Sequence, residues 1–275
     1  MRWARYMVQK PKVHLFTTDK SALKLLRLVF PVAEIVCVVV PENRVGSKKV
    51  SELINEANVP IVFHSKENPE KFLEGAPQAT FAISFLYSQI ICEQALSVYH
   101  DGALNFHGGR IPEYRGANVL NWALASGEKM LWATWHEMKE QLDSGAIFAE
   151  APIKVEQNDT AETCREKLIS AALRLFLPAW SRYVFDKKPI RTPNLQEGRL
   201  WPSRKEEDGE IMNFLSKSDI QNILLAQSSD RFPPAYRVHN GRKYEILGVV
   251  ENPVQGHIPY EASDGSLLWL KAQLK

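Results

Sequence analysis

Hydrophobic positions in the first third of the chain alternate between short β-branched runs and repeats at helical spacing. Leu23, Leu26 and Val29 recur at helical intervals between two apolar runs that read as strands. The same alternation predicts strands over residues 13–17, 34–40, 60–64 and 80–85, and helices over residues 21–30, 48–57 and 70–74. It is typical of an α/β fold with a Rossmann-like, mostly parallel sheet and helices on both faces.

Predicted strands and helices continue to alternate along the chain until about residue 190. We expect a strand end at residues 103–107, a helix over 118–126, strands over 131–138 and 147–155 as neighbours, and an amphipathic helix from a capping signal at 159–162 to about 184. Prolines and a change in composition then mark a boundary. The chain is therefore expected to form a core over residues 1–190 and a small C-terminal subdomain over 191–275, with a helix over 218–226 and a β-hairpin over 236–250 that turns at Asn240 and Gly241.

Composition narrows the class of protein. A chain of 275 residues with 45% hydrophobic content can bury a full core without disulfides or metals. Its formal charge of +2, without a basic stripe, argues against a nucleic-acid partner. Cys37, Cys92 and Cys164 lack disulfide or metal-ligand spacing, so no metal is expected. Residues 1–11 read as a loose tail without a secretory signal, and no apolar run could span a bilayer, so we expect a cytoplasmic protein without a membrane partner.

The turn after the first strand lacks the glycines of a dinucleotide site. Residues 17–20 read Thr-Thr-Asp-Lys, so the G-x-G-x-x-G fingerprint is missing. Without those glycines the backbone cannot approach a pyrophosphate closely at that turn. The sequence therefore lacks the usual motif for a site that binds NAD, NADP or FAD.

Two polar residues stand at the predicted carboxyl end of a strand. Asn105 and His107 are two positions apart, and the two-residue period of a strand puts both side chains on one face. Open parallel sheets bind ligands at this edge, so both side chains would point toward a ligand. The alternative is that they only shape the turn before Gly108 and Gly109.

A later segment adds an acid and a second imidazole. Residues 134–138 read as a strand that leads to Asp143. Asp143 either belongs to a reacting site or caps the turn at Ser144 and Gly145. His136 lies in an alternating pattern along this strand, and a packing role is the simpler interpretation of this residue.

Several segments together resemble one known family. They are Asn-Phe-His at 105–107, Ile-Pro-Glu-Tyr-Arg-Gly at 111–116, Asn-Trp-Ala-Leu at 121–124, Gly-Glu at 127–128, Thr-Trp-His-Glu-Met at 134–138 and Asp-Ser-Gly-Ala-Ile at 143–147. Their order and spacing resemble the signature of N10-formyltetrahydrofolate-dependent formyltransferases. The resemblance extends weakly to residues 84–90, 201–211 and 232–236.

The resemblance implies a site. It assigns catalysis to Asn105, His107 and Asp143. The folate candidates that it implies are Leu86, Tyr87, Ile90, Glu137, Met138 and Leu142. Ordinary core packing is the alternative for the first three of these.

The expected chemistry explains the residue types independently of the family. An amine that attacks a formyl carbon creates an oxyanion, which hydrogen-bond donors can stabilise. Asn105 can donate an amide N–H, and a protonated His107 can donate a charged hydrogen bond. A nearby Asp143 would favour and orient the imidazolium, and the pair could accept the proton that the amine loses.

The chain departs from the family pattern beside the histidine. Many members carry Pro-Ser-Leu-Leu there, whereas this chain has Gly108, Gly109, Arg110 and Ile111. We interpret Gly108, Gly109, Arg110 and Arg115 as acceptor-binding residues that could reach an anionic substrate, with ordinary surface or helix-end arginines as the alternative. Leu-Trp at 131–132 also replaces the expected Thr-Gly, which puts local packing in question.

Chain length bears on the acceptor amine. The size is similar to that of enzymes that formylate a dTDP- or GDP-linked amino-deoxy sugar for O-antigen and lipopolysaccharide synthesis, so a nucleotide-sugar substrate and a homodimer are expected. Methionyl-tRNA formyltransferase is one alternative, and it would require salt-sensitive RNA binding. A non-catalytic binding module of the same fold is another, although this chain has all three catalytic candidates. Glycinamide ribonucleotide formyltransferases resemble the core alone, and a deformylase resembles a longer chain.

Overall fold

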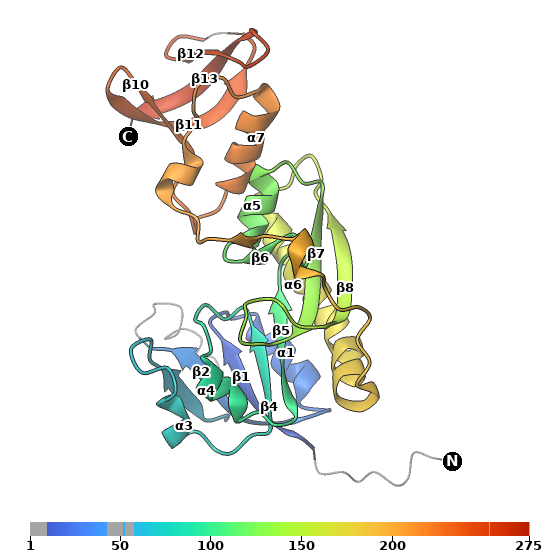
Figure 1. Ribbon diagram of the computed structural model, residues 1–275. Coiled ribbons are helices and arrows are strands. Elements are labelled where there is room, and N and C mark those ends of the chain that lie inside the picture. The colour runs from blue at the N-terminus through green and yellow to red at the C-terminus, as the bar shows by residue number, and fades with distance from the viewer. Residues whose placement is uncertain (1–9, 43–51, 53–57, 253, 275) are drawn as a thin grey trace. The chain divides into compact units, whose positions relative to one another are not determined.

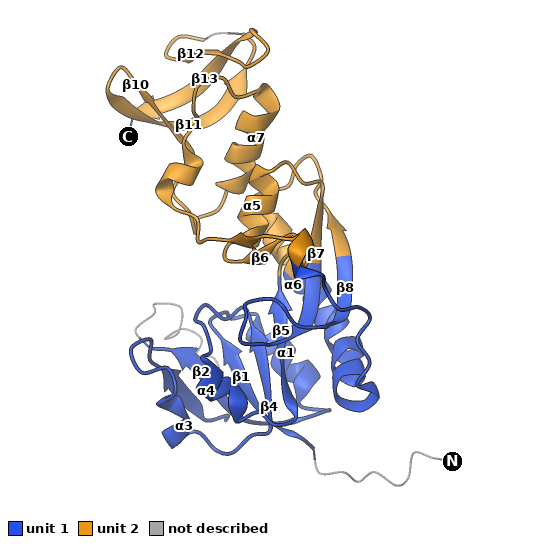
Figure 2. Ribbon diagram, viewed as in Figure 1, with its two compact units in different colours: residues 1–107, 133–151, 169–195 blue, residues 108–132, 152–168, 196–275 orange. Residues whose placement is uncertain are grey.

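The structure is a computed structural model that describes residues 10–42, 52, 58–252 and 254–274. Apart from residue 52, the expected helix over residues 48–57 lies outside these residues, as does most of the expected N-terminal tail. The chain divides into two compact units. The first comprises residues 1–107, 133–151 and 169–195, and the second comprises residues 108–132, 152–168 and 196–275 (Figure 2). The predicted boundary near residue 190 stays a prediction.

A seven-stranded sheet, in the order β3-β2-β1-β4-β5-β7-β8, organises the first unit (Figure 1). Neighbouring strands from β3 to β5 run parallel, and β5 pairs with β7 in antiparallel fashion. The fold is therefore the expected α/β class with a mostly parallel sheet. The strand bounds are β1 Lys12–Thr17, β2 Glu34–Pro41, β3 Ile61–His64, β4 Phe81–Phe85, β5 Gly102–His107, β7 Met130–Glu137 and β8 Ile147–Lys154.

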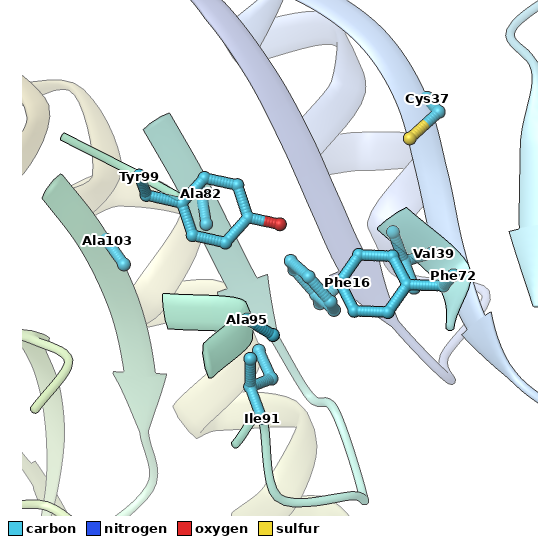
Figure 3. Packing of buried hydrophobic residues seen from close by; sticks show 9 residues of the cluster. All are labelled: Phe16, Cys37, Val39, Phe72, Ala82, Ile91, Ala95, Tyr99 and Ala103. Atoms are coloured by element: carbon cyan, nitrogen blue, oxygen red, sulfur yellow. The ribbon is translucent and has the colours of Figure 1, made fainter. Parts of the chain in front are cut away.

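Helices cover both faces of this sheet. On one face, apolar side chains of β1, β2, β4 and β5 pack against α3 (Phe72–Gly75) and α4 (Glu93–Ser97). Figure 3 shows Phe16 of β1 between the rings of Tyr99 and Phe72. Phe81 of β4 points to the opposite face, where its ring lies 5.4 Å from that of Trp180 in α6. Two longer helices in the described part of the chain are α1 (Ala22–Val29) and α6 (Ala161–Ser181). Helix α6 continues into a π-helical turn, Arg182–Asp186.

The strand order places a topological switch point at β1. The chain builds outward from β1 to β2 and β3 on one side, and then returns to form β4 and β5 on the other side. Open α/β sheets bind ligands at the carboxyl ends of strands near such a reversal. Ser84 pairs with Asn105 and Phe85 with Phe106, so the carboxyl ends of β4 and β5 lie at the same edge of the sheet.

The second unit combines helices with an antiparallel sheet. Strands β10 (Tyr236–His239), β11 (Arg242–Val250), β13 (Leu267–Leu274) and β12 (Ile258–Glu261) form this sheet, and helix α7 (Lys217–Ala226) contributes to the same hydrophobic core. The hairpin turns at Asn240 and Gly241 as expected, since both have positive φ. The unit also contains α5 (Val119–Ala125) and a pair of two-residue strands, β6 (Arg115–Gly116) and β9 (Leu200–Trp201).

The observed elements follow the expected ones with local differences. Helix α3 starts at Phe72 instead of residue 70, and α6 keeps α-helical hydrogen bonds only to Ser181. Helix α4 and strands β12 and β13 were not expected. The five residues of α4 are too few to show a helical period, and the role of β13 depends on pairing with strands far away in the sequence.

Candidate active site

Strand β5 positions the first two catalytic candidates. Asn105 pairs with His136 of β7, and His107 pairs with Thr134, so two neighbouring strands hold this segment. Asn105 and His107 lie on the same face, as the two-residue period predicts. His107 is 7% exposed, whereas Asn105 is half-buried. Both side chains are therefore held by the sheet near its carboxyl edge.

Asp143 reaches the same edge from the loop between β7 and β8. It adopts a left-handed backbone conformation with φ of 48°, and Ser144 closes the turn by donating a hydrogen bond to the carbonyl of Gln141 over 2.7 Å. Gly145 lies directly against β7. A Cβ atom at this position would lie 2.0 Å from the carbonyl oxygen of Glu137, so the loop can pass there only with glycine.

The structure brings His107 and Asp143 together. Nδ1 of His107 lies 3.4 Å from Oδ2 of Asp143, and the side chain of Asp143 is 11% exposed. In such a sheltered position a carboxylate favours the imidazolium form and orients the ring. The arrangement supports the interpretation of Asp143 as the partner of His107, rather than as a turn cap alone.

His136 connects the same carboxylate to Asn105. Its Nε2 lies 3.0 Å from Nδ2 of Asn105 and 3.3 Å from Oδ1 of Asp143, and its Nδ1 lies 2.7 Å from the carbonyl oxygen of Glu137. The residue is only 2% exposed. We expected a packing role for His136, and its burial agrees with this, but its polar contacts are with two catalytic candidates. Only the register of β5 with β7 reveals them.

The first group of folate candidates follows β4. Leu86 has φ of 53°, and its carbonyl accepts a hydrogen bond from Thr18 over 2.5 Å. The ring of Tyr87 stacks on His64 with centroids 5.8 Å apart, and its hydroxyl hydrogen-bonds to Nδ1 of that residue. Ile90 is 65% exposed. This segment thus combines a fixed backbone with one open apolar side chain.

The second group of folate candidates surrounds the Asp143 loop. The backbone of Glu137 bonds to Ala146 and His136, and its side chain pairs with Lys139 at 2.9 Å. Met138 is partly buried against the core, whereas Leu142 is 39% exposed.

The acceptor candidates follow His107 in the chain and belong to the second unit. The guanidinium of Arg110 lies 4.7 Å from the ring centre of Trp132, and its Nε lies 3.4 Å from Glu113. Arg115 is only 6% exposed, and among the described residues its buried Nε and Nη1 have no hydrogen-bond partner. Gly108 has room for a side chain, since a Cβ there would lie 3.7 Å from Leu168. Arg115 is thus a buried cation that lacks a protein anion within the described part of the chain.

Other chemistries have less support. Burial raises the pKa of the Cys37 thiol to about 12 and that of Cys164 to about 11, so neither is a thiolate nucleophile at neutral pH. Within the described ranges, no group of three or more His, Cys, Asp or Glu side chains could hold a metal ion. The site instead combines an amide donor with an imidazole–carboxylate pair. Such a set can stabilise an oxyanion and transfer a proton, which acyl transfer requires.

Comparisons with known proteins agree with this chemistry. The chain is 28% identical to methionyl-tRNA formyltransferase from Thermodesulfovibrio yellowstonii over 244 residues, which cover 84% of this chain and 78% of the relative. Among solved structures it resembles WlaRD, a sugar 3N-formyl transferase, with a TM-score of 0.69 at 14% identity over 97% of this chain and 99% of the other. A 4-N formyltransferase from Francisella tularensis also gives 0.69, at 17% identity over 85% and 95% of the two chains.

A longer protein shares the fold as well. HypX from Aquifex aeolicus matches with a TM-score of 0.60 at 17% identity, and the match covers 95% of this chain but only 45% of HypX. These structural likenesses are below 25% identity and show the fold alone. The decisive match is the model of the formyl transferase family, which spans residues 31–179 and therefore covers more than half of the chain. The protein thus belongs to the formyl transferase family.

Proposed function

We propose that this protein transfers a formyl group from N10-formyltetrahydrofolate to the primary amine of a nucleotide-linked amino-deoxy sugar. A dTDP- or GDP-linked sugar for O-antigen and lipopolysaccharide synthesis is the proposed acceptor. The observation that carries the reaction type is the approach of Asp143 to His107, 3.4 Å apart, on a chain that belongs to the formyl transferase family. The sugar acceptor is supported by the sugar formyl transferases that share the fold over most of both chains.

Each of the three catalytic candidates has a separate proposed role in acyl transfer. Addition of an amine to a formyl carbon moves negative charge onto the formyl oxygen. Asn105 and protonated His107 are the donors proposed to stabilise that charge. Asp143 would keep His107 oriented. As the intermediate collapses, the bond between the formyl carbon and N10 breaks. The His107–Asp143 pair, directly or through a water molecule, would pass the proton lost by the amine to N10 of the departing tetrahydrofolate.

The proposed folate site uses the segments that flank the catalytic candidates. Ile90 and Leu142 are exposed apolar side chains on these segments, and they suit a flat pterin. Leu86, Tyr87, Glu137 and Met138 complete the proposed set, with backbone groups as hydrogen-bond partners. N10-formyltetrahydrofolate would supply the formyl carbon as a substrate. The WlaRD structure was obtained with 5-N-formyl-THF and one HypX structure with tetrahydrofolic acid, which supports a folate donor.

Arg115 supports an anionic acceptor. Burial of a guanidinium without a counter-charge is unfavourable, so a bound phosphate would relieve it. Gly108 and Gly109 are proposed to let the acceptor approach the backbone, and Arg110 to add positive charge. WlaRD was solved in the presence of dTDP, which fits a nucleotide diphosphate at this group of residues.

A second acceptor is favoured by a different observation. The curated relative that matches 84% of this chain is a methionyl-tRNA formyltransferase. An enzyme of that kind would bind the acceptor end of a charged tRNA, with an affinity that falls steeply with salt. The small formal charge of +2 argues for the sugar instead.

Assembly and location remain predictions. A homodimer and a cytoplasmic location are proposed from the size and sequence of the chain. None of the described helices is long and apolar enough to cross a membrane.

A direct assay separates these acceptors. The protein is incubated with N10-formyltetrahydrofolate and a panel of dTDP- and GDP-linked 3-amino and 4-amino sugars, with methionyl-tRNA in a parallel reaction. Formylated sugar is detected by mass spectrometry, and tetrahydrofolate by its absorbance. We expect formylation of at least one sugar and none of the tRNA. Formylation of the tRNA alone would replace the proposed acceptor, and no turnover with either class would support the binding-module alternative.

A further inference from the structure

We propose that His136 is a positioning residue, which holds the Asn105 amide so that one N–H bonds to the imidazole and the other faces the reacting oxygen. The juxtaposition of Asn105 Nδ2 and His136 Nε2, 3.0 Å apart, carries the inference. Its kinetic consequences rest on the proposed formyl transfer. The hydrogen bond itself can be tested without any turnover.

One hydrogen bond of His136 places a proton on its Nδ1. Nδ1 lies 2.7 Å from the carbonyl oxygen of Glu137, which can only accept, so Nδ1 must carry a proton. In a neutral ring Nε2 then has a lone pair and no proton. A lone pair accepts a hydrogen bond, so it selects the N–H side of the Asn105 amide and rejects the carbonyl side.

This selection matters because an asparagine amide has two different ends. Rotation about χ2 by half a turn exchanges an oxygen for an NH₂ group, and the torsion is soft. With the NH₂ group toward His136, one N–H is used by the imidazole and the second remains available. With the oxygen toward His136, the donor would be lost from that position.

Asp143 links this device to the catalytic imidazole. Its Oδ1 lies 3.3 Å from the same Nε2 of His136, while its Oδ2 lies 3.4 Å from His107. A proton on Nε2 could bond to Asp143, but it would also face an N–H of Asn105. The amide would then have to turn its oxygen toward His136. Neutral His136 is therefore the state that keeps Asn105 as a donor.

The surroundings of His136 favour a fixed orientation. It is 2% exposed, and its strand pairs with β5 directly opposite Asn105. The His136 side chain is already fixed by its surroundings, so it loses little conformational entropy when it orients the amide. The hydrogen bond can therefore hold the Asn105 amide throughout the reaction.

The kinetic test compares His136→Phe with His136→Gln, because phenylalanine cannot accept a hydrogen bond and glutamine can. We expect His136→Phe to lower kcat about 10²–10³-fold, as loss of one oxyanion donor does, with the KM values for both substrates changed less than about threefold. His136→Gln should recover at least about tenfold of that loss. Combination of His136→Phe with Asn105→Ala should cost little beyond either change alone.

A matched control is His14→Phe. His14 is also 2% exposed, and both of its ring nitrogens form hydrogen bonds, one with Tyr99 and one with Pro77. Within the described part of the chain, it has no hydrogen bond with Asn105, His107 or Asp143. Its replacement should lower the free energy of unfolding without a change in kcat, and its effects should add to those of Asn105→Ala. Normal kcat in His136→Phe, or full additivity with Asn105→Ala, would overturn the proposal.

A spectroscopic arm keeps the proposal testable if His136→Phe does not fold or if no acceptor is found. Long-range ¹H–¹⁵N spectra of the wild-type protein at neutral pH report which ring nitrogen of His136 carries the proton. We expect the Nδ1–H tautomer, and a shift of the Asn105 side-chain NH₂ signals in His136→Gln. A proton on Nε2 at neutral pH, in either the Nε2–H tautomer or the imidazolium form, would refute the inference even if formyl transfer is confirmed.

Discussion

The carboxylate of Asp143 lies 3.4 Å from Nδ1 of His107, although one helix and two strands separate the two residues along the chain. Both side chains are largely sheltered from water, at 11% and 7% exposed. Their electrostatic coupling is therefore screened less than that of a surface pair.

Asn105→Ala and His107→Ala should each nearly abolish formyl transfer while the fold persists. Loss of an oxyanion donor typically raises the barrier by about 2.7–4 kcal/mol, which corresponds to a loss of roughly 10²–10³ in kcat. Steady-state kinetics measure the loss, and circular dichroism with thermal unfolding confirms the fold. Near-normal turnover in either variant would remove that residue from the reacting site.

Asp143→Asn should lower kcat by about 10²-fold or more, with smaller effects on KM, because an amide neither favours the imidazolium form of His107 nor helps to accept a proton. The pH dependence of kcat provides the check, since the His107 pKa should fall without the negative charge. An unchanged profile would show that Asp143 acts only in the turn.

Gly145→Ala tests whether the loop depends on close passage along β7. The new Cβ would lie 2.0 Å from the Glu137 carbonyl oxygen, so the loop must move and carry Asp143 with it. We expect a loss of activity together with about 1–3 kcal/mol of stability, the usual cost of overpacking. The control is Gly75→Ala, where no atom lies within 4 Å of the added Cβ. Similar activity in the two variants would contradict this account.

Arg115→Gln should raise the KM for the nucleotide sugar by about 10–100-fold. This corresponds to the loss of one hydrogen bond to a charged group, which contributes about 1.5–3 kcal/mol. The free energy of unfolding should stay the same or rise, because the buried guanidinium has two nitrogens without partners among the described residues. Arg242→Gln, at an exposed position of the hairpin, serves as the control. An acceptor KM that does not respond to Arg115→Gln would exclude this residue from the acceptor site.

Stability should fall as the pH drops below about 6.5, because burial lowers the pKa values of His14 and His64 from that value. The unfolded chain then binds more protons than the folded one, and each histidine contributes a slope of at most about 1.4 kcal/mol per pH unit. Urea unfolding at pH 7.5 and 5.5 measures the difference. His14→Phe should reduce it, because the variant lacks one of these two buried imidazoles. An equal pH response in wild type and His14→Phe would contradict the assignment.

The sequence by itself determined the class of fold and the strand that carries Asn105 and His107. These features depend on local periods, since two-residue alternation defines the faces of β5 and alternation of strands with helices defines a parallel sheet. The hairpin at Asn240 and Gly241 was predictable for the same reason, because its positive φ values are local preferences of those residue types.

Only the tertiary structure decided which side chains meet. His136 looked like a packing residue because nothing in its own segment reveals that β7 pairs antiparallel with β5 and places it opposite Asn105. The approach of Asp143 to both imidazoles likewise depends on a left-handed turn and on a glycine that tolerates close contact with β7. Pairing between distant strands is set by the burial of the whole sheet, so a local pattern cannot encode it.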